Sequence, residues 1–246
     1  MRSTRLNLLR ASLALVALLA CGAAPATKAP GEPWATDFAV DASQMSSTGR
    51  NPYFVLEPGY QILLEEGQNR MLVTVLAETR VVDGIETRAV EERETFKGQV
   101  TELSRNYYAI NKQTLDVLEY GEEVSNFRNG KVVNNNGSWL AGVKKARAGL
   151  LLPGKARVGY RYYQEQAPGV TMDRAEIVSV GLTQKTPAGT FENCVRTEVT
   201  SPMAPPADKE YRDYAPGIGL VKFESMVLVK YGFQDGSSTG KAGGGF

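Results

Sequence analysis

The feature that most constrains the fold of this chain is a series of short apolar or alternating runs separated by turn sequences. Residues 71–77 are rich in β-branched side chains, and Asp83-Gly84 follows them as a hairpin signal, because a type I′ turn needs positive φ at both central positions. Further runs of the same kind cover residues 101–111, 116–120, 131–133, 158–165, 170–184, 190–200, 209–214 and 220–231. The connections between them carry Asn-Gly, Pro-Gly or Pro-Ala-Gly. The pattern predicts strands joined by tight turns.

Helical periodicity is weak throughout this part of the chain. Residues 141–151 are the one stretch with some helical character. We therefore predict an all-β protein with a single antiparallel meander of about ten strands, forming a strongly curved sheet or half-barrel. An open sheet of that size twists and exposes its edges, so we expect its ends to be covered or curled.

The N-terminus has the order of a bacterial lipoprotein signal. Three arginines precede an apolar region over residues 11–19, and Ala20 then stands before Cys21. The apolar region is too short to span a membrane, which takes about 20 residues. Cys21 would be the acylated residue, and several acyl chains anchor a protein much more firmly than one. An ordinary cleaved signal, cut within residues 22–26, is the alternative.

These segments predict four parts: a lipoprotein signal peptide over residues 1–20, a flexible tether over 21–50, an antiparallel β domain over 51–234 and a flexible Gly-rich tail over 235–246. Gly22 is not the Asp that typically retains lipoproteins at the inner membrane. We therefore expect a lipid-anchored protein of the bacterial cell envelope, at the outer membrane.

Composition excludes several kinds of chemistry. The chain has no histidine, and if Cys21 is acylated, Cys194 is the single remaining thiol, expected in the core. Serine–histidine catalysis, histidine-ligated metals and thiolate metal cages are thereby excluded. Without residues 1–20, the net charge is −2, from 25 Lys and Arg against 27 Asp and Glu, which gives no basic excess for nucleic acid. We expect no enzyme activity, cofactor or metal, although a carboxylate pair in a cleft carries no local signature.

The Asp83-Gly84 turn also predicts a register. If Val82 pairs with Ile85, Glu94 faces Val73 and Glu92 faces Val75, so both glutamates share a face with apolar side chains. We interpret Glu92 and Glu94, partnered by Arg88, as candidate ligand-binding residues in a concave cavity. The alternative is that a bulge rotates the two glutamates to solvent.

Eight segments carry a resemblance to known proteins: residues 51–59, 90–95, 104–110, 120–123, 129–131, 137–142, 187–191 and 214–219. Together they resemble a family of uncharacterised secreted bacterial β-rich proteins. The resemblance implies a shape and a compartment but no reaction, and residues 144–148 depart from the family's more acidic loop. There is a looser similarity to the half-barrel lipoprotein carriers of the outer-membrane sorting pathway, which close their cavity with helices.

Two functions follow as expectations. The first is a binding module that holds a hydrophobic or lipid-like small molecule in the concave face of the sheet, within the roughly 300–1,000 Å³ typical of ligand sites. The second is a structural or interaction lipoprotein with a filled core, which meets a protein partner through a sheet edge or through the loop at residues 127–136.

Overall fold

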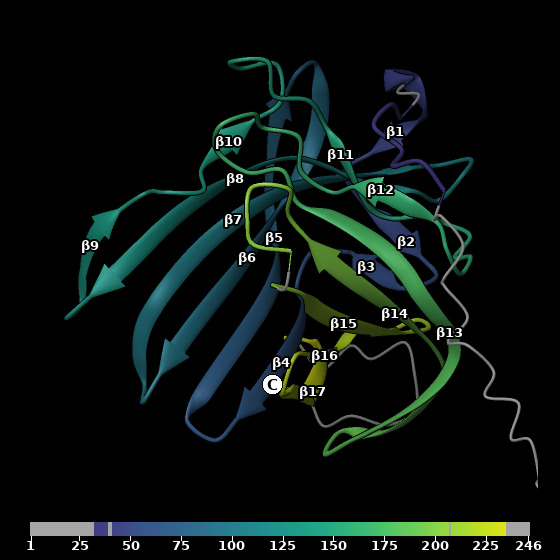
Figure 1. Cartoon of the computed structure of the whole chain (residues 1–246). Coiled ribbons are helices and arrows are strands. Elements are labelled where there is room, and N and C mark those ends of the chain that lie inside the picture. Colours follow the sequence, from purple (N-terminus) through teal and green to yellow (C-terminus); the bar gives the residue numbers. More distant parts are fainter. Residues whose placement is uncertain (1–31, 39–40, 207, 235–246) are drawn as a thin grey trace, which may run out of the picture. The chain divides into compact units, whose positions relative to one another are not determined.

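The computed structural model describes residues 32–38, 41–206 and 208–234 (Figure 1). The chain divides into two units, residues 1–30 and 31–246, and all of the described residues belong to the second. The signal peptide, Cys21 and the Gly-rich tail lie outside the described residues. No helix within the described ranges has the length and apolar character needed to cross a membrane.

The prediction of an all-β protein is confirmed. Regular structure in the described residues consists of one 3-10 turn, η1, and 17 strands. The bounds are η1 (Ala42–Gln44), β1 (Met45–Ser46), β2 (Gly49–Asn51), β3 (Phe54–Leu56), β4 (Tyr60–Glu66), β5 (Asn69–Val82), β6 (Ile85–Phe96), β7 (Gln99–Asn111), β8 (Val117–Arg128), β9 (Lys131–Asn134), β10 (Trp139–Leu140), β11 (Gly149–Leu152), β12 (Arg161–Tyr163), β13 (Arg174–Thr186), β14 (Gly189–Thr200), β15 (Glu210–Ala215), β16 (Gly219–Phe223) and β17 (Met226–Phe233). The number of strands is larger than the sequence pattern indicates, because many connections form short strands of their own.

One antiparallel sheet of 15 strands contains almost all of them, in the order β10-β8-β7-β6-β5-β4-β17-β16-β15-β14-β13-β12. Three further strands join this sheet: β1 pairs with β7, whereas both β9 and β11 pair with β8. Strands β2 and β3 form a separate two-stranded sheet. Within this order β4 to β8 and β12 to β17 are two meanders, joined where the last strand, β17, pairs with β4. The sheet stays open, with β10 and β12 at its ends, and β5 to β8 curve strongly (Figure 1).

The predicted hairpin between β5 and β6 forms at Asp83-Gly84. Val82 pairs with Ile85, and both turn residues have positive φ, 49° and 78°. The register then shifts between Val75 and Thr79, where β5 contains a bulge. This bulge determines where the two predicted glutamates meet β5.

Part of the segment predicted as a tether contacts the sheet. Residues 45–50 include β1 and the start of β2, and Ala35 forms a parallel bridge with Tyr162 of the end strand β12. The Trp34 ring lies within 5.1 Å of the Arg161 guanidinium and 4.3 Å of the Arg174 guanidinium, measured from the ring centre. Residues 32–38 therefore cover the exposed edge of β12, as sheet edges generally require.

Apolar side chains form three clusters on the sheet. The largest joins β3, β4 and β5 to β15, β16 and β17, and Cys194 lies fully buried in it, as predicted. The residues 127–136, predicted as a loop, form the hairpin of β8 and β9, and β9 is exposed along its length. Residues 141–151 contain no helix; the strand β11 begins at Gly149.

Candidate functional site

A cavity of about 270 Å³ lies against the inner face of the curved sheet. One part of its wall is apolar and comes from β3, β4, β5, β11 and β16, for example Ile62, Val73, Leu151, Leu220 and Phe223. Another part is acidic. Eight carboxyl groups line the cavity: Glu92, Glu94, Glu102, Glu119, Glu122, Glu165, Asp173 and Glu210. The cavity therefore offers both an apolar and an acidic surface.

Strand alternation brings half of these eight carboxyl groups together. Glu92 and Glu94 on β6, Glu102 on β7 and Glu210 on β15 all occupy even positions, whose side chains share the inner face of each strand. Glu94 stands directly opposite Glu102 in the β6–β7 pair. Like charges at directly opposite positions destabilise a sheet. Cross-strand pairing therefore does not explain why Glu94 and Glu102 stand opposite each other.

A bulge on β8 adds two more carboxyl groups to the cavity wall. Asn106 pairs with Glu122 and Tyr108 pairs with Glu119, so β8 uses one more residue than β7 between these pairs. The extra residue turns both Glu119 and Glu122 to the inner face, although simple alternation would separate them. Gly121 lies in this bulge with φ of 150°, and a Cβ there would meet the carbonyl oxygen of Trp139 at 2.6 Å.

The structure places the predicted Glu92 and Glu94 on the cavity wall. Their partners on β5 differ from the expected ones by two residues: Glu92 faces Val73, and Glu94 faces Met71. The β5 bulge causes this shift. Because a shift of two residues preserves the face, the glutamates stay on the inner side and are not rotated to solvent.

Arg88 does not join them, and its predicted partnership with the glutamates is wrong. Its side chain is buried and donates from Nη1 to the carbonyl oxygen of Ala77 at 2.6 Å and from Nε to that of Ser47 at 2.9 Å. Arg88 therefore satisfies backbone carbonyls, one of them in the β5 bulge. It is not among the described residues that line the cavity.

The cationic residue of the cavity is Arg212 on β15. It is the single Lys or Arg among the described lining residues, and its Nη2 donates to Glu210 at 3.0 Å. Its Nε is buried without a hydrogen-bond partner in the described residues. Burial opposes the charge, but the neighbouring Tyr214, Glu210 and Glu92 outweigh it and raise the pKa of Arg212. Arg212 thus stays charged.

Burial raises the pKa of the cavity carboxyl groups. Desolvation, followed by the repulsion of neighbouring acids, raises the pKa of Glu94 to about 7 and that of Glu122 to about 8. The pKa of Glu165 rises to about 7 by burial and by Asp173, although Thr171 donates a hydrogen bond that opposes the rise. Burial also raises the pKa of Glu119 well above its ordinary value. Several of these groups therefore hold protons near neutral pH.

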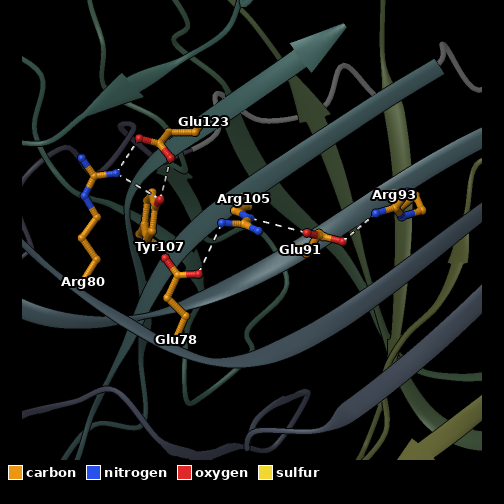
Figure 2. Close-up of polar contacts among 7 residues, drawn as sticks. All are labelled: Glu78, Arg80, Glu91, Arg93, Arg105, Tyr107 and Glu123. Carbon is orange, nitrogen blue, oxygen red and sulfur yellow. Dashed lines mark hydrogen bonds and ion pairs between the residues drawn. The ribbon is translucent and has the colours of Figure 1, made fainter. Parts of the chain in front are cut away.

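The opposite face of the same strands is organised differently (Figure 2). Glu91 accepts from Arg93 at 3.2 Å and from Arg105 at 3.4 Å. Glu123 accepts from Arg80 at 2.5 Å and from the Tyr107 hydroxyl at 2.8 Å. The Arg80 hydrogen bond, despite some burial, lowers the pKa of Glu123. Each of these acids has a cationic partner, which most of the cavity acids lack.

Sequence reasoning missed six of the eight carboxyl groups and Arg212. The Lys97-Gly98 turn pairs Phe96 with Gln99, and this register alone would set Glu94 opposite Thr101. The observed bulge at the start of β7 places Glu102 there instead. The turn by itself would therefore place Glu102 on the other face of β7, and the bulge is what brings its side chain to the cavity wall.

The described residues contain no group of three or more His, Cys, Asp or Glu side chains arranged to hold a metal ion. The carboxyl groups are instead distributed along the wall. Chemically, such a wall can bind protons or surround an extended positively charged group with several acceptors.

Comparison with known proteins assigns this chain neither a family nor a function. No protein-family model matches the chain, and no curated protein matches it. A solved structure from Bacteroides fragilis, assigned as an exported protein with a YmcC-like fold, is 15% identical, with a TM-score of 0.39. The match covers 74% of this chain and 100% of that one. No function follows from this likeness.

Proposed function

We propose that this protein binds an amphipathic small molecule in the cavity on the inner face of its sheet. The observation that carries this proposal is the two-part wall, apolar on β4, β5 and β16 and acidic on β6, β7 and β8. At about 270 Å³ the cavity lies just below the roughly 300–1,000 Å³ of typical ligand sites. It therefore suits a single short chain with a polar head better than a two-chain lipid.

The proposed role is binding and not catalysis. A general acid and a general base act as a pair at a defined separation across the bond they cleave. The cavity instead contains eight carboxyl groups spread over several strands. An apolar wall beside a polar region is the usual arrangement of a ligand site.

We further propose that the protein works in the cell envelope, at the outer membrane, anchored through acylated Cys21. The support is the order of the basic region, the apolar region and Ala20-Cys21 in the sequence.

Replacement of Cys21 is expected to remove the anchor. In cells fed labelled palmitate, C21S should carry no label and move to the soluble fraction, because the thiol is the acylated group. C194S is the matched control, since it alters the buried second cysteine, and it should stay labelled and membrane-bound. A labelled C21S chain, or an unlabelled native chain, would refute the lipid anchor.

The ligand is expected to be extractable from the purified protein. Native mass spectrometry of the full chain should give an adduct that disappears after organic extraction. V73F should reduce the adduct roughly tenfold, because Val73 lines the cavity and overfilling costs about 1–3 kcal/mol. V81F on the same strand is the control, because Val81 is 68% exposed and should leave the adduct unchanged.

Urea unfolding of both variants shows whether V73F still folds. If folded native protein carries no adduct and takes up none from a lipid extract, the binding proposal is wrong. The interaction alternative would then gain weight, since β9 presents Val132 and Val133 at an exposed edge strand.

A further inference from the structure

The cavity has a large excess of acidic groups. Of its eight carboxyl groups, Glu210 is paired with Arg212, and no other Lys or Arg lines the cavity among the described residues. Ionised carboxylates in a partly desolvated site are unfavourable unless they are paired. Each of the remaining groups must therefore keep a proton or receive a positive charge from outside the chain.

Glu119 shows this most clearly. Its side chain lies on the cavity wall and the residue is 3% exposed. No hydrogen bond or ion pair to its carboxyl group exists within the described part of the chain. Buried polar groups nearly always have a partner, so an unpaired carboxyl group directed into a cavity indicates that the partner is a ligand or solvent.

A comparison of the two faces of the sheet independently indicates that most of the cavity acids lack positively charged partners. On the opposite face Glu91 pairs with Arg93 of its own strand β6 and with Arg105 of β7 (Figure 2). Glu123 of β8 pairs there with Arg80 of β5. Arginines of β5, β6 and β7 thus pair with the acids on one face, whereas these strands supply no arginine to Glu92, Glu119 and Glu122 on the other. The absence of arginines from the cavity wall of these strands leaves room for a cation to enter.

We propose that the ligand of the cavity carries a positively charged amine head, which lies among the carboxyl groups of β6 and β8 while its apolar chain lies against β4 and β5. This inference rests on the proposed binding function and specifies the ligand class. An ammonium group donates three hydrogen bonds and has no acceptor, so it complements carboxylates that are distributed along a wall. A bare metal ion would need three or more ligands gathered at one point, which the described residues do not provide.

The test compares three probes with the same chain and different heads: decylamine, decanol and decanoate. Calorimetric titration into the full chain at neutral pH should show that decylamine binds about tenfold more tightly than decanol. One charge-assisted hydrogen bond is enough to give an affinity difference of this size. Decanoate should bind most weakly, because the cavity is acidic.

Paired variants locate the head. E119Q and E122Q should weaken decylamine binding about tenfold and leave decanol binding unchanged. E91Q and E123Q are the matched controls, because they neutralise acids of β6 and β8 on the opposite face. They should change neither decylamine binding nor decanol binding. Glutamine keeps the shape of glutamate, and urea unfolding of each variant verifies that it folds.

The outcomes separate the two proposals. Equal binding of decylamine and decanol, or decylamine binding that E119Q and E122Q leave intact, overturns the cationic head while the binding function stands. Failure of all three probes to bind overturns both. Full displacement of decylamine by magnesium also overturns the amine head, because it would show a metal site.

Discussion

The free energy of unfolding is expected to fall by about 3 kcal/mol as the pH rises from about 5 to about 8, because each carboxyl group with a raised pKa contributes up to about 1.4 kcal/mol per pH unit and coupled groups contribute less than their sum. The groups responsible line the cavity. Burial, and then repulsion between neighbours, raises the pKa of Glu94 to about 7 and of Glu122 to about 8, and burial with Asp173 raises that of Glu165 to about 7.

The direction follows from proton binding. A carboxyl group with a raised pKa binds its proton more tightly in the folded state than in the unfolded chain. Its contribution to the free energy of unfolding is complete below the pKa of the unfolded chain. That contribution is lost as the pH rises through the pKa of the folded state. Glu57, whose hydrogen bond from Arg50 lowers its pKa despite some burial, has the opposite effect, which appears only as the pH falls below its ordinary value. Stability should therefore be greatest near pH 5, in mildly acidic solution.

Urea unfolding at several pH values measures this effect. The double variant E119Q/E122Q should be more stable than the native chain at high pH and should show a flatter pH dependence, since it removes two groups that must lose protons. E91Q/E123Q is the control and should leave the slope between pH 5 and 8 unchanged, because both acids lie on the opposite face of the sheet, outside the cavity. A stability that rises from pH 5 to 8 would contradict the burial of the cavity acids.

The second large effect is expected for G149A, which should lower the free energy of unfolding by about 3 kcal/mol, the upper end of the usual range for overpacking. A Cβ at residue 149 would lie 2.0 Å from the carbonyl oxygen of Gln164 and 2.4 Å from its carbonyl carbon. These are backbone atoms, so no side-chain rotation can relieve the contact. Strand β11 would have to move away from the segment that carries Gln164 and Glu165.

This movement would also affect the cavity. Gln164 donates from Nε2 to the carbonyl oxygen of Leu151 at 3.0 Å, and Leu151, Gln164 and Glu165 all line the cavity. G149A should therefore weaken binding of any cavity ligand as well as lower the urea midpoint.

G181A is the control for this substitution. Gly181 has φ of 73° and open space around its Cβ position, so alanine there should lose only about 1–2 kcal/mol for the left-handed conformation. If G149A were no more destabilising than G181A, β11 and residue 164 could not be in the close contact described here.

Local sequence patterns determine the fold class and part of the site. Alternation and turn residues indicate an all-β chain, and the Asp83-Gly84 turn places Glu92 and Glu94 on the apolar face of their hairpin. That prediction survives the β5 bulge because the bulge shifts the register by two residues, and side chains return to the same face every two residues.

The rest of the site depends on features that no local pattern specifies. One-residue shifts in β7 and β8 bring Glu102, Glu119 and Glu122 onto the cavity wall, where turn register and alternation place some of them on the other face. Arg212 reaches the cavity from β15, since β4 and β17 pair and join the two meanders. Arg88, although close in sequence to Glu92 and Glu94, instead donates hydrogen bonds to backbone carbonyl groups. The sequence alone determined strands, turns and the first two glutamates, whereas bulges and long-range strand pairing, which depend on the packing of the whole sheet, decided which charges share the cavity.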